Sequence, residues 1–135
     1  MSFDYEKERR EALDAGERAL SSLRAARKEL NSASKWGVVD IFGGGLFTDI
    51  MKHSKMNNAE RYMSQAKYDL QSFGRELQDV AAYVDLDFNT ADFLHFADYF
   101  LDGFLADWLM QGRINNARTQ VEDAIQKVES ILRRL

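Results

Sequence analysis

Three stretches of this sequence repeat apolar or small residues at alternating steps of four and three. Such spacing places the repeated side chains on one stripe of an α-helix, and a stripe of this kind is buried against another helix. Three of these stripes, here called seams, in one short chain predict an intramolecular antiparallel bundle. The seams are Ala12, Gly16, Ala19, Leu23, Ala26, Leu30 and Ala33; Met56, Ala59, Met63, Ala66, Leu70, Phe73, Leu77 and Val80; and Ile114, Ala117, Val121, Ala124, Val128, Ile131 and Leu135.

The seams and the glycines together define the expected elements. The chain has 135 residues, the size of one domain, and no proline to interrupt long helices. We expect a single helical domain over 1–135, with helices over 4–34, 48–83, 91–111 and 113–135 and a glycine-rich loop over 35–47. Thr90 or Asn89 is expected to cap the third helix. The predicted fold class is all-α: an elongated antiparallel three- to four-helix bundle with coiled-coil-like packing.

The segment over 91–111 is densely aromatic. Phe93, Phe100, Phe104 and Trp108 share one wide helical face, which is typical of a helix at the centre of a fold. We expect this helix and the glycine-rich loop to form a packed aromatic head near one end of the bundle. Gly74 lies inside the second predicted helix and is interpreted as tolerated, at a cost of about 1 kcal/mol relative to alanine.

Composition excludes several classes of function. The net charge is −4, whereas proteins that bind duplex nucleic acid or anionic membranes usually carry a basic excess. There is no cysteine, so disulfides, thiolate nucleophiles and thiolate zinc sites are excluded. No run approaches the roughly 18 apolar residues of a membrane span, and the first residues lack the apolar core of a secretory signal. We therefore expect a cytoplasmic protein without a membrane span and without a nucleic-acid partner.

The glycine-rich loop is a candidate anion site. Gly43, Gly44 and Gly45 precede an expected helix start whose free N–H groups can hold an anion, and Lys52 follows on that helix. The spacing matches neither the P-loop nor the dinucleotide-binding pattern. The interpretation we favour is a tight turn whose backbone is crowded by Trp36 and its apolar neighbours.

Two histidine and aspartate sets form a candidate metal site. Asp49 and His53 lie four residues apart on one expected helix, and His95, Asp98 and Asp102 share a stripe of another. Facing helices of bundles build metal sites from such groups, although the Glu-x-x-His pairs of di-iron proteins are absent. The alternative is a solvated face whose carboxylates pair with basic side chains. The same groups could act as acid and base, but no nucleophile or oxyanion-hole motif accompanies them, so no catalytic residue and no cofactor is predicted.

Charge patterning supplies a third candidate surface. No lysine or arginine occurs between Arg75 and Arg113, and aromatic residues exposed in this acidic stretch would mark a protein-binding or oligomerisation surface. The alternative, which we favour, is that these aromatic residues fill the core. A small basic group at Arg24, Arg27 and Lys28 lacks interleaved aromatic residues and is interpreted as a solvated face.

Two runs of this sequence carry a resemblance to other proteins. The first comprises Trp36-Gly37, Asp40, Gly43-Gly44-Gly45, Thr48 and Lys52-His53-Ser54, and the second is the aromatic and aspartate run over 96–108. Together they resemble an uncharacterised group of bacterial all-helical proteins, with the resemblance covering residues 30–135. It brings no activity and no catalytic residue. It implies that the glycine-rich loop, Lys52-His53 and the aspartates of the third helix form one site.

These observations lead to two main hypotheses. The first is a non-enzymatic helical interaction or scaffold protein that binds a protein partner or self-associates. The second is a small metal- or anion-binding protein whose site is formed by the glycine-rich loop and the His/Asp cluster. Insertion of the aromatic helix into a membrane is a third possibility, which Asp98, Asp102 and Asp107 make costly.

Overall fold

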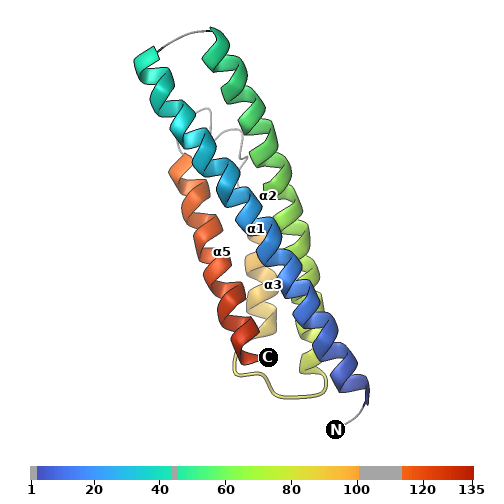
Figure 1. The fold of residues 1–135 in the computed structure, drawn as a ribbon. Helices are drawn as coiled ribbons and strands as arrows, with labels where there is room; N and C mark the ends of the chain where they lie inside the picture. Colours follow the sequence, from blue (N-terminus) through green and yellow to red (C-terminus); the bar gives the residue numbers. More distant parts are fainter. Residues whose placement is uncertain (1–2, 44–45, 101–113) are drawn as a thin grey trace.

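The chain forms a bundle of long helices (Figure 1). A computed structural model describes the backbone of residues 3–43, 46–100 and 114–135, and the side chains of 4–32, 58–100 and 115–135. The described helices are α1 (Phe3–Gly43), α2 (Leu46–Ala81), α3 (Thr90–Tyr99) and α5 (Ile114–Arg134). The described backbone contains no strand, which confirms the predicted all-α fold class. None of the described helices combines the length and the apolar character needed to cross a membrane.

The helices pack in antiparallel pairs. α1 packs against α2 and α5, and α2 also packs against α3. Between α1 and α5, Arg9 Nε donates to the Leu135 carbonyl oxygen at 2.7 Å, whereas Arg27 Nη1 donates to Glu122 Oε1 at 3.1 Å. Residue numbers therefore rise along one helix as they fall along the other. Figure 1 shows α1 and α2 as a long hairpin, with α3 and α5 beside its lower part and both chain ends at that same end.

The three predicted seams form the core. Every seam residue whose side chain is described is buried, except Leu135, which is half-buried. Burying one leucine or valine side chain contributes about 1.5–3 kcal/mol, so the seams supply most of the free energy that holds the helices together. Ala33, Met56 and Ile114 belong to the seams but lie outside the described side chains.

Two glycines allow the core aromatic residues to pack closely. Phe73 is fully buried, and its ring meets that of Phe93 edge to face with centroids 5.4 Å apart. A Cβ atom added to Gly16 would lie 3.0 Å from the Phe73 ring. A Cβ atom added to Gly74 would lie 2.5 Å from Leu94 Cδ2, so this glycine admits α3 to the surface of α2. Gly74 thus makes room for α3, a packing role that the sequence analysis did not predict.

The predicted end of the first helix at residue 34 is wrong. α1 continues to Gly43 and α2 begins at Leu46, so most of the predicted glycine-rich loop over 35–47 is helical. Residues 35–42 contain no proline and one glycine, Gly37. A single glycine costs about 1 kcal/mol, which does not stop a helix that is already propagating.

The third helix starts as predicted but ends early. The Asn89 side-chain oxygen accepts from the backbone N–H groups of Ala91 and Asp92, at 2.9 and 3.1 Å. A continuous helix over 91–111 is wrong at Phe100, whose backbone is extended with φ −61° and ψ 129°. The Phe100 ring is 1% exposed, as its place on the predicted apolar face implied, although no break signal in the sequence marks the end of the helix there. Residues 101–113 lie outside the described backbone.

The described aromatic helix and the glycines lie at different ends of α2. Gln71 Nε2 of α2 donates to Asp98 Oδ1 of α3 at 3.0 Å. Gln71 lies about 37 Å along α2 from Leu46 at 1.5 Å per residue. The described part of the predicted aromatic head is therefore remote from the glycine segment, in contrast to the expectation that the two share one end.

Candidate functional site

The described members of the predicted metal site on α3 are both exposed. The His95 ring packs on the Tyr99 ring with centroids 4.4 Å apart, and Asp98 accepts the hydrogen bond from Gln71. The basic side chains considered as partners of Asp98, which are Lys35, Lys52 and Arg113, lie outside the described side chains, so this alternative stays a prediction. Some described carboxylates lie close enough together to be potential metal ligands, but neither His95 nor Asp98 belongs to that group.

The other predicted site residues lie far along α2 or outside the described parts. Asp49, Lys52 and His53 belong to the first turns of α2, where only the backbone is described. His53 precedes Gln71, the partner of Asp98, by about 27 Å of helix. The described Asp98 thus lies beside a part of α2 remote from the backbone of His53, and the place of Asp102 lies outside the described residues.

The anion site predicted at Gly43, Gly44, Gly45 and Lys52 stays a prediction. Gly43 ends α1, whereas Gly44, Gly45 and Asp102 lie outside the described backbone.

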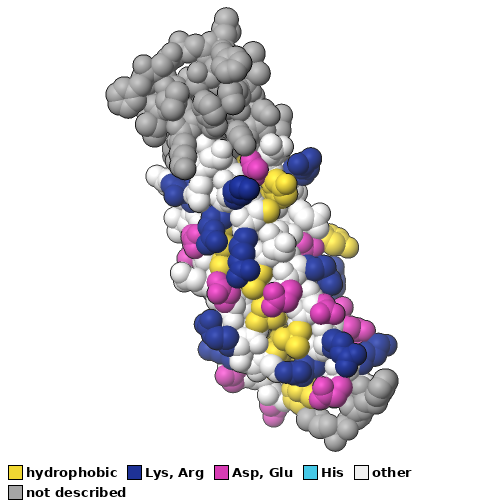
Figure 2. All heavy atoms as spheres, in the orientation of Figure 1, with side chains coloured by type: hydrophobic (Ala, Val, Ile, Leu, Met, Phe, Trp, Pro, Cys, Tyr) yellow, Lys and Arg dark blue, Asp and Glu magenta, His cyan; other side chains and the backbone are white. Residues whose placement is uncertain are grey.

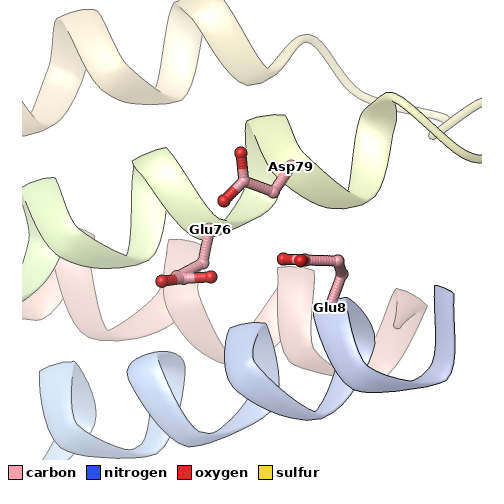
Figure 3. A group of neighbouring side chains, drawn as sticks. All are labelled: Glu8, Glu76 and Asp79. Atoms are coloured by element: carbon pink, nitrogen blue, oxygen red, sulfur yellow. The ribbon is translucent and has the colours of Figure 1, made fainter. Parts of the chain in front are cut away.

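Three carboxylates that the sequence analysis did not single out come together between α1 and α2. Glu8 of α1 meets Glu76 and Asp79 of α2, with one oxygen of each within 4.8 Å of the others. Figure 3 shows the three side chains turned toward one another from the two helices. Here this group is called the carboxylate cluster. Its members belong to two different helices, so the sequence reveals it only once the α1–α2 register is known.

Burial and neighbouring negative charges raise the pKa of two members of the carboxylate cluster, Glu8 and Glu76. Burial raises the pKa of Glu76 above its ordinary value, and the negative charges of Glu11 and Asp79 raise it further, although Arg18 lowers it. Burial also raises the pKa of Glu8, and again Glu11 and Asp79 add to the effect. The Oε2 atoms of Glu8 and Glu76 are covered and have no hydrogen-bond partner. Ionisation of Glu8 and Glu76 therefore opposes folding at neutral pH.

Replacing Glu76→Gln should stabilise the bundle at pH 7. The folded-state pKa is raised above the ordinary 4.5, so stability of the native chain is greatest below that value and falls as pH rises. Glutamine removes this loss, and we expect a gain of about 0.5 kcal/mol that disappears as the pH falls to 4.5. Urea unfolding at a series of pH values measures it. Glu60→Gln, at an exposed position of the same helix, serves as the control. A less stable variant at pH 7 would show that the cluster is held by a favourable interaction.

A second feature is an open groove between α3 and α5. Of the four sides of the bundle, α1–α2, α1–α5 and α2–α3 are closed by direct helix packing, and α3 and α5 form the remaining side. The groove has a volume of about 540 Å³. Its floor is apolar and consists of Phe88, Phe93, Phe96 and Ile131. Its rim is polar and consists of Asn89 and Asp92 on the α3 side, and of Asp123, Gln126, Lys127, Ser130 and Arg134 on α5.

Weak contacts connect the two sides of this groove. Lys127 Nζ lies 5.1 Å from the centroid of the Phe96 ring. Arg134 Nε lies 3.8 Å from Asp87 Oδ2, and the two side chains are 46% and 70% exposed. Exposed contacts of these kinds contribute about 1 kcal/mol or less each. Breaking these two contacts therefore costs little.

The predicted aromatic surface is partly buried in the core, and the predicted basic group lies on the surface of the bundle. Phe93 and Phe100 are buried, as the core interpretation predicts, whereas Tyr99 is 54% exposed. In the basic group on α1, the Arg27 guanidinium is bonded to Glu122 at 3.1 Å, which partly neutralises it. Figure 2 shows lysine and arginine side chains interspersed with acidic ones over the described part of the face seen there.

Comparisons with protein-family models, with curated proteins and with solved structures found no match. They therefore give no indication of catalysis, and the resemblance carried by the 36–54 and 96–108 runs stays a prediction. The function is inferred below from the surfaces of the bundle.

Proposed function

We propose that this chain is a non-enzymatic helical interaction protein and that the α3–α5 groove is the surface by which it binds its partner. One observation carries the proposal: an apolar floor lies open on the side of the bundle where the described helices do not pack against each other. Phe93 and Ile131 of the floor are buried in the core, whereas Phe88 and Phe96 are only partly buried against it and supply the floor's exposed apolar surface. Grooves of this form accept the apolar face of a partner helix.

The chemistry of the groove supports binding rather than catalysis. Among the described residues, its lining includes the Ser130 hydroxyl, two carboxylates, Lys127 and Arg134, but no histidine. A serine nucleophile requires an adjacent base, and transition-state stabilisation requires a site closed to water. An open groove with an apolar floor and a charged rim instead has the anatomy of a protein interface.

Site-specific photo-crosslinking tests this proposal. The photoreactive residue p-benzoylphenylalanine replaces Ser130 in the groove or, as a matched control, Ser64 at an exposed position of α2. In cells that express the chain, we expect a covalent adduct from position 130 and none from position 64, with the captured protein identified by mass spectrometry. Phe96→Glu should remove the adduct, because it places a charge on the apolar floor.

Two outcomes contradict the proposed function. One is that position 130 forms no adduct with any protein, including the chain itself. The other is that both positions form the same adducts. Far-UV circular dichroism of the Phe96→Glu variant verifies that the bundle is still folded.

A further inference from the structure

The two edges of the α3–α5 groove carry opposite charges. On the α3 side, Asp87 and Asp92 are exposed, and Asp92 begins the helix. On the α5 side, Lys127 and Arg134 are exposed. Asp123 adds one acidic group further up α5. The α3 edge has no basic residue of its own, because the sequence contains no lysine or arginine between Arg75 and Arg113.

These charges are poorly satisfied within one chain. The Arg134–Asp87 separation of 3.8 Å is long for an ion pair, and both side chains remain largely exposed. The Lys127 ammonium lies over the Phe96 ring and thus at the opening above the apolar floor. Both edges therefore keep charge available for a partner, and the floor between them keeps apolar surface.

A second copy of the chain fits this pattern. About a twofold axis, each contact between α5 of one copy and α3 of the other occurs twice. Lys127 and Arg134 of each copy then face Asp87 and Asp92 of the other, so both sets of contacts are attractive. A surface with one sign of charge would repel its own copy, whereas this one is complementary to itself.

We infer that the α3–α5 groove is a self-association surface, in which a second copy of the chain lays its α5 edge against the α3 edge of the first about a twofold axis. This inference rests on the proposed function and names its partner. The apolar floor of each copy is covered by the other, and the charged edges fix the relative orientation of the copies. Because the groove is short, the dimer should be weak and should dissociate on dilution.

Charge reversal tests the inference. One variant carries Lys127→Glu with Arg134→Glu, and the other carries Asp87→Lys with Asp92→Lys. Each variant alone has like charges on both edges, and we expect its dimerisation to weaken by at least about tenfold. Mixed in equal amounts, the two variants have complementary edges at both contacts, so a heterodimer should form within about threefold of the wild-type affinity. Sedimentation equilibrium from about 1 μM to 1 mM measures all three cases.

A matched control and the crosslinking experiment separate the possible failures. Arg24→Glu with Lys28→Glu changes the net charge as much as the first variant but at exposed positions of α1, and it should dimerise as the wild type does. A wild type that stays monomeric throughout, or a mixture that shows no recovery, overturns the inference. If the wild type is monomeric while position 130 crosslinks to a different protein, the proposed function stands without self-association. If position 130 captures nothing, both fail.

Discussion

Replacing Phe73→Ala should lower the free energy of unfolding by about 3–5 kcal/mol. The Phe73 ring is fully buried, contacts Phe93 edge to face, and lies against the Cβ position of Gly16. Its removal leaves a cavity where α1, α2 and α3 meet, and neighbouring helices can relax into it only partly. Equilibrium urea unfolding followed by circular dichroism measures the loss, and the midpoint should fall without a change in slope.

Tyr68→Ala is the matched control for this substitution. Tyr68 also lies on α2 but is 61% exposed, so its truncation should change stability by no more than about 0.5 kcal/mol. If Phe73→Ala costs as little as Tyr68→Ala, the ring is not in the core and the packing described between these helices is incorrect.

Replacing Gly16→Leu should destabilise the bundle by about 2 kcal/mol. A Cβ atom at this position would lie 2.6 Å from Leu132 Cδ2 and 3.0 Å from the Phe73 ring, so the larger side chain must push α5 and α2 away from α1. Overpacking of this kind costs about 1–3 kcal/mol, and the side chain of leucine extends further than Cβ. The gain in helix propensity is about 1 kcal/mol and is too small to compensate.

Gly16→Ala separates the two opposing effects. Leu132 is partly buried and can move its methyl group, so the propensity gain and the crowding should nearly cancel for alanine. Ser21→Leu, at an exposed position of the same helix, should be close to neutral. Hydrogen exchange should show faster opening of α5 amides in Gly16→Leu. Equal stabilities for Gly16→Leu and the wild type would contradict the close approach of the three helices.

The seams could be predicted from the sequence because each is a local pattern. A residue such as Leu23 or Val121 is buried because it repeats at helical spacing, and neither the partner nor the register is needed to see this. The Asn89 cap is local in the same sense. The end of α1 was harder to predict. The glycine triplet sets the last residue at which the helix can end, but the helix could also have ended before it.

The register between α1 and α2 could not be predicted, and the carboxylate cluster depends on it. An end of α1 at residue 34 centres the hairpin near residue 41, whereas the observed junction lies at 44–45. The facing residues then shift by about seven, which is one heptad and leaves every seam residue facing a seam residue. Seam periodicity alone therefore cannot distinguish the two registers. Only the observed register brings Glu8 opposite Glu76 and Asp79.

The groove depends on a different non-local fact. The sequence predicted one long aromatic helix, and a continuous helix past Phe100 would have been a different neighbour for α5. Instead α3 ends at Tyr99 and the backbone of Phe100 is extended, and no local signal in the sequence marks that end. The acidic stretch was visible in the sequence, but its position opposite Lys127 and Arg134 was not.

The central claim is that the three seams bury one another within a single chain and leave the α3–α5 side for a partner. Methyl nuclear Overhauser effects test it most directly, because Leu23, Leu70 and Val128 come from the seams of α1, α2 and α5 and belong to one core cluster. In a sample that mixes labelled and unlabelled chains, we expect these effects within one molecule and no intermolecular ones among these three residues. Intermolecular effects among them would mean that the seams join separate chains, and the bundle described here would be contradicted.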